Sequence, residues 1–383
     1  MEFTFIAPTK TIFKSGALDE IGSHIGGFGK RFLIVIDPAF EKNGTLDVLK
    51  TRLNELNIAY TCYLGVVEEP DVSYVDECSL QAQEFGCDAV LAVGGGSCID
   101  VGKAAAGVIT NGLPIKDYLE YVGTGRKIEK PPLPFIAMPT TAGTGAEVTK
   151  LAVIGSKKEQ FKRSIRDDQL IANLCVIDPK LCVSAPPKVT AIAGIDAMAH
   201  LLEAFATWKG TPMTRALALS GIELAGKYLK RVYNDGSDLE AREGMSLAAY
   251  LGGIAFSNSG LGAAHGMGMA INIYYPVPHG FGVGVSLPYV MEVNANNDPA
   301  LYDQVGEVFA GKRFGKTGEG TIYAIDFIKK LSAHIGIPLN LKELGADEET
   351  ALLMGEKCFG TSMSGNPVQL DGKAWGEVFL KMI

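Results

Sequence analysis

The architecture of this chain follows from one stretch, Ala89-Val90-Leu91-Ala92-Val93-Gly94-Gly95-Gly96-Ser97, in which an apolar run passes directly into three glycines. Such a run is typical of a strand that is buried on both faces of a parallel sheet. A helical pattern follows it. Glycines at this point could bring backbone N–H groups close to a phosphate, or they could form a tight turn in which Ser97 caps the helix. The turn alone leaves both interpretations open, because it is neither Gly-x-Gly-x-x-Gly nor a P-loop.

The segments around this stretch repeat the alternation of strand and helix. Apolar runs predict strands at residues 31–37, 59–64, 135–138 and 174–178, and helical spacing predicts helices around residues 46–56 and 74–85. An N-terminal apolar segment could add an edge strand. This alternation predicts right-handed βαβ units in an open, parallel, Rossmann-like sheet. After the proline pair at 186–187 only helical spacing remains, so we predict an α/β dinucleotide-binding domain over residues 1–185 and an all-helical domain over residues 186–383.

A second candidate ligand loop, residues 139–149, follows the strand at 135–138. It contains four threonines, Thr140, Thr141, Thr144 and Thr149. Their hydroxyls could bind a polar ligand or could satisfy the loop's own backbone. Two such loops at strand ends favour a ligand, because open sheets bind ligands at the carboxyl ends of their strands. Asp37 could then accept hydrogen bonds from an adenosine ribose and repel a 2′-phosphate, which favours NAD over NADP, or it could simply cap the next helix.

Three of the five histidines fall in short motifs of the second half, at His200, His265 and His279. Asp196 lies four residues before His200, so the two share one face of a helix. One carboxylate and three imidazoles suit a divalent transition metal such as Fe(II) or Zn(II), and are too rich in nitrogen for magnesium or calcium. The Asp-x-x-x-His pair alone is weak evidence, since such pairs occur on many solvated helices. The other two histidines complete a site only if the fold brings them together.

The composition argues against several classes of function. The net charge is −8 and there is no long cluster of lysine and arginine, so a nucleic-acid or anionic-membrane role is not expected. No apolar run approaches the roughly 20 residues that span a bilayer, and the N-terminus does not resemble a signal peptide, so we expect a cytoplasmic protein. The seven cysteines contain no Cys-x-x-Cys, which predicts free thiols.

Taken together, these motifs resemble the iron-containing (group III) alcohol dehydrogenase family over essentially the whole chain. The matching motifs are Gly94-Gly95-Gly96-Ser97-x-x-Asp100-x-x-Lys103, Pro139-Thr140-Thr141-Ala142-Gly143-Thr144-x-x-Glu147-Val148-Thr149, Gly194-x-Asp196-Ala197-x-x-His200-x-x-Glu203, and the segments around His265 and Pro278-His279-Gly280. Within the family, residues 146–149, 260–262 and 360–367 resemble the lactaldehyde:propanediol oxidoreductases.

The resemblance implies a metal-dependent hydride transfer between a nicotinamide cofactor and a small primary alcohol, diol or aldehyde. It also implies a homodimer or a larger homo-oligomer. The implied metal is Fe(II), or alternatively Zn(II), with ligands Asp196, His200, His265 and His279. The implied cofactor is NAD, with NADP less favoured, and its expected contacts are Asp37, Gly94, Gly95, Gly96, Ser97, Asp100, Thr140, Thr141, Thr144, Thr149 and Lys162.

The chain departs from the family's pattern at four positions. Cys98 replaces a common proline and Ala146 a common serine, and we expect both to be tolerated. The other two departures bear on the chemistry. Met269 stands where many members have a histidine four residues after the third ligand, and Glu69 stands where asparagine commonly precedes a proline. A thioether neither donates nor relays a proton, so we expect the proton to leave through water or a cofactor ribose. Two alternatives stay open. One is a cyclising lyase of the dehydroquinate synthase type, although no basic cluster for a sugar phosphate surrounds the ligand motifs. The other, suggested by Met269, is a catalytically weak metal or nucleotide binder.

Overall fold

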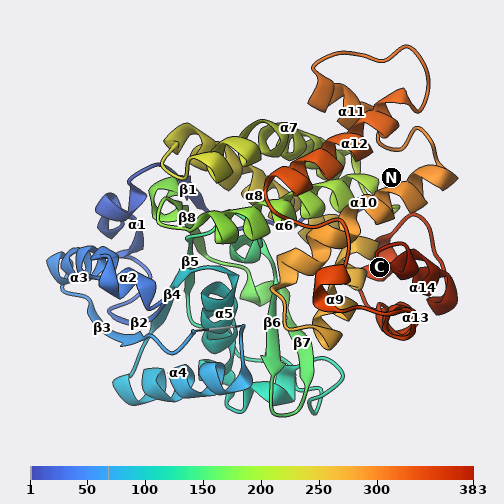
Figure 1. Ribbon diagram of the computed structural model, residues 1–383. Coiled ribbons are helices and arrows are strands. Elements are labelled where there is room, and N and C mark those ends of the chain that lie inside the picture. The colour runs from blue at the N-terminus through green and yellow to red at the C-terminus, as the bar shows by residue number, and fades with distance from the viewer. Residues whose placement is uncertain (1, 68) are drawn as a thin grey trace. The chain divides into compact units, whose positions relative to one another are not determined.

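The computed structural model describes residues 2–67 and 69–383, and the chain divides into two compact units (Figure 1). The first, the α/β unit, holds residues 7–141 and 145–183. The second, the helical unit, holds residues 184–383 together with Ala142–Thr144 and the N-terminal residues up to Ile6. The domain limits predicted from the sequence are 1–185 and 186–383. They remain a prediction, because the two compact units describe how the chain packs and do not test domain limits.

Among the described residues of the α/β unit, six parallel strands form one sheet in the order β1-β8-β5-β4-β2-β3. This sheet and the helices that follow it confirm the predicted fold class. Every strand predicted from an apolar run is present, and a short N-terminal strand occupies one edge. The strands are β1 Thr11–Phe13, β2 Arg31–Ile36, β3 Ala59–Tyr63, β4 Ala89–Gly94, β5 Phe135–Pro139 and β8 Leu174–Ile177.

Helices cover both faces of this sheet. Successive side chains of a strand point to opposite faces, so Leu33 and Val35 join one hydrophobic core and Phe32 and Ile34 join the other. Helices α4 and α5 pack in the first core, and α1, α2 and α3 pack in the second. Burial on both faces explains why the strands are continuous apolar runs. The helices are α1 Gly22–Ile25, α2 Ala39–Lys42, α3 Thr45–Glu55, α4 Val72–Phe85 and α5 Gly96–Asn111.

The sequence analysis does not predict the antiparallel hairpin of β6 (Leu151–Ser156) and β7 (Phe161–Arg166). Strand β6 alternates half-buried and buried residues, and β7 is mostly polar, so neither strand forms an apolar run. Gln160 completes the turn between them with a positive φ of 54°. The hairpin carries Lys162, one of the residues that the resemblance assigns to the cofactor.

The helical unit contains the remaining long helices, and α6 lies among α7, α8 and α10. Helix α6 is long and apolar enough to cross a membrane, but most of its residues are buried inside the protein, as expected of a central core helix. The helices are α6 Pro187–Ala206, α7 Pro212–Asn234, α8 Leu239–Ser259, α9 Ala263–Tyr274, α10 His279–Asn297, α11 Asp303–Ala310, α12 Glu319–His334, α13 Glu348–Lys357 and α14 Gly372–Leu380.

Three ionisable side chains, Asp100, Lys103 and Glu147, are buried in the interior of the α/β unit. The Lys103 ammonium donates hydrogen bonds to the carbonyl of Ala146 at 2.5 Å, the carbonyl of Leu151 at 2.8 Å and the Thr149 hydroxyl at 2.9 Å. Helix α5 is thereby tied to the end of the threonine-rich loop. Burial lowers the pKa of Lys103 to about 8, and it raises the pKa of Asp100 to about 6 and that of Glu147 to about 7.

We predict that Glu147→Gln reduces the pH dependence of stability. The pKa of Glu147 is about 7 in the folded protein, above its ordinary value of 4.5. The folded state therefore binds more protons than the unfolded state between these values, and stability decreases as the pH rises through this window. Glutamine does not titrate. The free energy of unfolding of the variant, relative to that of the parent, should therefore rise by up to about 1.4 kcal/mol per pH unit as the pH increases through this window.

Urea unfolding of both proteins at several pH values between 4.5 and 7 measures this difference. Glu84→Gln, at an exposed position on α4, is the control and should follow the parent. Parallel stability curves for Glu147→Gln and the parent would contradict the prediction.

Candidate metal centre and cofactor loops

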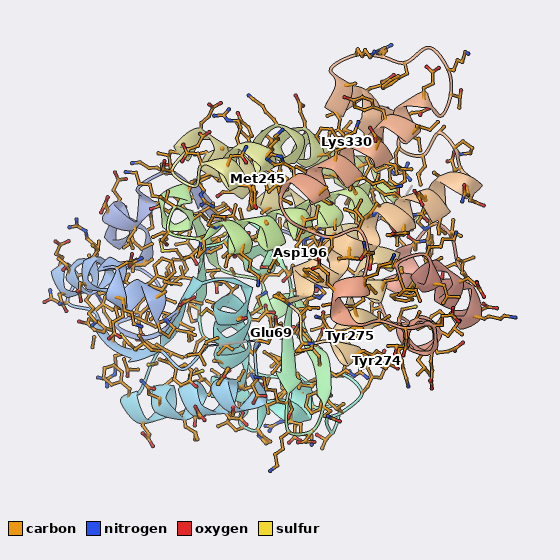
Figure 2. All side chains as sticks on the ribbon, viewed as in Figure 1. Glu69, Asp196, Met245, Tyr274, Tyr275 and Lys330 are labelled. Atoms are coloured by element: carbon orange, nitrogen blue, oxygen red, sulfur yellow. The ribbon has the colours of Figure 1, made fainter. Side chains whose placement is uncertain are left out.

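Asp196 and His200 lie one turn apart on α6. Figure 2 labels Asp196 among the side chains of the protein. Both side chains are buried, with exposed fractions of 3% for Asp196 and 5% for His200. A carboxylate and an imidazole in the core of a helical unit are costly to bury unless they have polar partners. The sequence spacing predicted that the two residues share a helix face. The structure shows that this face is buried and is not exposed to solvent.

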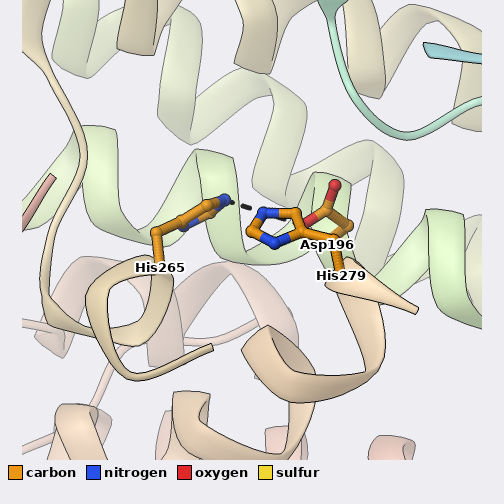
Figure 3. A group of neighbouring side chains, drawn as sticks. All are labelled: Asp196, His265 and His279. Atoms are coloured by element: carbon orange, nitrogen blue, oxygen red, sulfur yellow. Dashed lines mark ion pairs between the residues drawn. The ribbon is translucent and has the colours of Figure 1, made fainter. Parts of the chain in front are cut away.

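His265 and His279 come to the same point from two other helices. His265 is in the first turn of α9, and His279 is the first residue of α10. Figure 3 shows both imidazoles beside the Asp196 carboxylate. The candidate ligand atoms of Asp196, His265 and His279 all lie within 4.8 Å of one another. The fold therefore supplies the proximity that sequence spacing could not show.

Close helix packing through glycines makes this convergence possible. A Cβ atom on Gly280 would lie 2.5 Å from the carbonyl oxygen of Ile192 and 3.0 Å from the Cβ of Asp196. A Cβ on Gly282 would lie 3.0 Å from the carbonyl oxygen of Gly268. Only glycine lets the start of α10 approach both α6 and α9 so closely. The position of His279 depends on these contacts.

Among the polar atoms at the centre, Asp196 Oδ1 and His265 Nε2 are buried without a hydrogen-bond partner in the described structure. They face each other at 3.6 Å, which is longer than a hydrogen bond (Figure 3). The other nitrogen of His265, Nδ1, lies 2.5 Å from the Glu203 carboxylate. Metal-binding histidines commonly engage one ring nitrogen with a protein acceptor in this way and present the other to the metal.

His200 follows the same rule, although its nitrogens are outside the group of atoms within 4.8 Å. Its Nδ1 lies 3.3 Å from the carbonyl oxygen of Gly143, which leaves Nε2 for a ligand. The ring is held between Phe256 and His265, each with its ring centroid 4.5 Å away. This stacking fixes the plane of the imidazole next to the other candidate ligands.

The electrostatics of the centre favour a positive charge between Asp196 and His265. Burial alone would raise the pKa of the Asp196 carboxyl, but the imidazoles, His200 foremost, hold it below its ordinary value. Burial lowers the pKa of His200 to about 4. Burial also opposes a charge on His265, yet the carboxylates of Glu203 and Asp196 raise its pKa to about 10. A divalent cation at this point would receive the same stabilisation, so the donor set fits a transition metal.

Three of the candidate cofactor residues of the α/β unit, Asp37, Gly94 and Thr140, lie where the strand order reverses. The chain runs from β2 to β3 and then places β4 on the opposite side of β2, which is the kind of switch point where open sheets bind ligands. Asp37 follows β2 there, and its N–H donates to the Val93 carbonyl at 3.1 Å. The N–H of Thr140 donates to the Gly94 carbonyl at 2.9 Å. The threonine-rich loop therefore begins beside the glycine turn.

The structure separates these candidates by what their side chains already contact. Asp37 Oδ1 accepts a hydrogen bond from the N–H of Ala39 at 2.9 Å, so the aspartate caps the next turn as one of the two interpretations predicted. The other carboxylate oxygen, Oδ2, does not take part in this hydrogen bond. The hydroxyl of Thr149 is buried against Lys103. The ammonium of Lys162 pairs with the Glu69 carboxylate at 2.7 Å. Glu69, the acid at a position where the family commonly has asparagine, thus already contacts the lysine assigned to the cofactor.

The sequence analysis assigns no role to Glu203 or Asn366. Glu203 contacts His265, and Asn366 contacts the start of α9. Glu203 lies three residues after His200 on α6, so helical spacing alone could have placed it on the ligand face. Asn366 comes from a loop near the C-terminus and contacts the start of α9, and no local pattern indicates this. Met269, one turn beyond His265 on α9, is 36% exposed.

The α/β unit has candidate ligand groups at a switch point of its sheet, and the helical unit has a carboxylate–imidazole centre that fits a divalent metal. Comparisons with known proteins agree. The family model described as iron-containing alcohol dehydrogenase matches residues 8–179, and the model of the C-terminal part of the Fe-containing alcohol dehydrogenase family matches residues 190–381. The chain belongs to the iron-containing alcohol dehydrogenase family, and its activity is that of an alcohol/aldehyde oxidoreductase.

Individual proteins show the same likeness. Alcohol dehydrogenase 4 of Schizosaccharomyces pombe is 37% identical over 347 residues, covering 90% of this chain and 80% of the relative. The NAD-dependent methanol dehydrogenase of Bacillus methanolicus is 31% identical over 357 residues, covering 93% of each protein. A crystal structure of 1,3-propanediol oxidoreductase superimposes with a TM-score of 0.94 at 29% identity and covers 100% of both chains.

We predict that Gly280→Ala weakens the centre. The added methyl group would overlap the Ile192 carbonyl and press on Asp196, so α10 must shift and carry His279 away. Overpacking of this kind typically costs about 1–3 kcal/mol of stability. Metal content after loading and dialysis should also fall. Gly315→Ala, at a position where an added Cβ would meet nothing within 4 Å, is the control. Normal metal content and melting temperature in Gly280→Ala would show that the close approach is not required.

Proposed function

We propose that this protein is an NAD- and Fe(II)-dependent alcohol dehydrogenase that interconverts small primary alcohols or diols and their aldehydes. The observation that carries the proposal is the facing pair of buried atoms, Asp196 Oδ1 and His265 Nε2, which have no hydrogen-bond partner in the described structure. Both atoms would be satisfied as ligands of a divalent metal. Zn(II) is the alternative, since carboxylate and imidazole ligands suit both ions.

Asp196, His200, His265 and His279 would hold the metal. When bound, the metal supplies a Lewis acid for the substrate oxygen, and nicotinamide supplies the acceptor or donor of the hydride. The residues of the chain orient these groups. Glu203 and the Gly143 carbonyl fix the imidazole planes of His265 and His200. Both rings and the Asp196 carboxylate are buried, which limits the access of water to these three side chains.

The nucleotide would bind at the switch point of the sheet. The glycine turn and the N-terminus of α5 offer N–H groups to a pyrophosphate, and Asp37 offers a carboxylate to a ribose. The NAD-dependent methanol dehydrogenase among the relatives supports NAD as the cofactor. Lys162, paired with Glu69, would reach the nucleotide from the hairpin.

Met269 changes how a proton leaves the substrate hydroxyl. It lies four residues after His265, where it shares a face of α9 with that ligand. Its thioether cannot relay a proton, and its side chain is partly exposed. We propose that water or a ribose hydroxyl of the cofactor accepts the proton in this chain.

The activity is tested with protein purified without oxygen and loaded with Fe(II) or Zn(II). NADH formation from ethanol, 1-propanol, 1,2-propanediol and 1,3-propanediol is followed by absorbance. We expect metal-dependent turnover of at least one of these alcohols. His279→Ala should bind no stoichiometric metal and lose roughly a hundredfold or more in kcat/KM.

His334→Ala is the matched control, because His334 is exposed on α12, where its Nε2 lies 2.9 Å from Asn234 Oδ1. It should keep both metal and activity. Full metal content in His279→Ala would remove that residue from the site, and no turnover of any alcohol with either metal would favour a metal or nucleotide binder.

Asp37 provides a prediction for cofactor choice. Its carboxylate would repel a 2′-phosphate, so Asp37→Gly should raise the ratio of kcat/KM for NADP to that for NAD by roughly tenfold, equivalent to about 1.4 kcal/mol. Asp37→Asn keeps an acceptor for the Ala39 N–H and removes only the charge, so it should move the ratio in the same direction. An unchanged ratio in both variants would remove Asp37 from nucleotide selection.

A further inference from the structure

We propose that Glu203 is a positioning residue that makes His265 a metal ligand by holding the imidazole proton on Nδ1. The inference rests on the proposed metal centre. It concerns two residues of this chain that are in direct contact, with Glu203 Oε2 and His265 Nδ1 only 2.5 Å apart. Both side chains are buried, with exposed fractions of 5% and 4%. A hydrogen bond in such a site is strong and is not exchanged for one to water.

The first turn of α9 shows why Glu203 cannot turn away from this position. The first N–H groups of a helix have no partner within the helix, and the N-cap residue Gly262 has no side chain to bond them. Glu203 Oε1 accepts from the N–H of Ala264 at 2.6 Å and from that of His265 at 3.3 Å. One oxygen of the carboxylate therefore caps α9, and the other oxygen faces the ring of His265.

Asn366 completes the cap without contacting the ring. Its Oδ1 accepts from the N–H of Ala263 at 3.3 Å, and it is held by a pair of hydrogen bonds with Asn294. A Cβ on Gly262 would lie 2.9 Å from Glu203 Oε1 and 3.1 Å from Asn366 Oδ1, so the glycine leaves room for both side chains. The same helix end thus has one cap that contacts the imidazole and one that does not.

A carboxylate has a specific consequence for the imidazole, because it can only accept hydrogen bonds. The nitrogen that faces it must carry a proton, so the proton that leaves the ring when a metal binds is the one on Nε2. That atom faces Asp196 Oδ1 at 3.6 Å. Glu203 therefore keeps Nδ1 protonated and reserves Nε2 for a metal, through a contact that is present before any ion binds.

Glu203→Gln reverses this arrangement at almost the same volume. The two backbone N–H groups require the amide oxygen on their side, since an amide NH₂ would meet two donors. The NH₂ group then faces His265 Nδ1, which must become an acceptor, and the ring proton moves to Nε2. A protonated Nε2 cannot bind a metal, so a loss of affinity of about 10–100-fold is expected.

The experiment compares the parent, Glu203→Gln and Asn366→Ala by two readouts. The first is NMR of the full chain with ¹⁵N-labelled histidine, without metal, in which the parent should show a slowly exchanging Nδ1–H of His265. This signal should be lost in Glu203→Gln and kept in Asn366→Ala. The second is the dissociation constant of Zn(II) from competition with a chromophoric chelator, which should rise only in Glu203→Gln. Both variants should lower the melting temperature, since each removes or alters a cap.

Two results would overturn the proposal. One is an unchanged Nδ1–H signal and unchanged Zn(II) affinity in Glu203→Gln. The other is an equal loss of affinity in Asn366→Ala, which would show that only the helix end matters. If the parent itself binds no metal, the proposed function fails, and the NMR signal of the metal-free proteins still decides the role of Glu203 at the ring.

Discussion

The proposed metal centre depends on one pair of buried polar atoms, Asp196 Oδ1 and His265 Nε2. They face each other at 3.6 Å without a hydrogen-bond partner in the described structure. The two groups form a buried ion pair that is too long for a hydrogen bond, and a buried ion pair often contributes no more to stability than apolar side chains of similar volume. The pair is therefore better explained by a bound ligand than by a contribution to the stability of the fold. The positive charge that the surrounding carboxylates favour makes a cation the ligand that fits.

The packing around the pair serves to keep it in place. Glycines at 268, 280 and 282 allow three helix segments to approach within the reach of short side chains. Glu203 joins the start of α9 to the imidazole it carries, and Phe256 holds the plane of His200. The α/β unit uses different means. Its candidate ligand groups are backbone N–H groups at the end of β4 and a carboxylate after β2, positioned by the register of parallel strands.

Patterns within short sequence windows predicted the features that depend on neighbouring residues, such as buried strands and shared helix faces. The strand β4 and its glycine turn were evident because burial on both faces produces an uninterrupted apolar run. The hairpin of β6 and β7 was not, since its polar second strand makes no such run. Asp196 and His200 share a helix face, so their spacing was informative. Their meeting with His265 and His279 depends on helix packing, and the contact of Asn366 with α9 spans more than a hundred residues, which no window of sequence contains.

The central claim is that one divalent metal is held by one carboxylate and three imidazoles. X-ray absorption at the iron edge, on protein loaded with Fe(II) in the absence of oxygen, tests it most directly. The account predicts about one iron per chain, a first shell of nitrogen and oxygen at about 2.0–2.2 Å, and the outer-shell scattering of imidazole rings. A sulfur ligand at about 2.3 Å, or the scattering of fully hydrated iron, would contradict it.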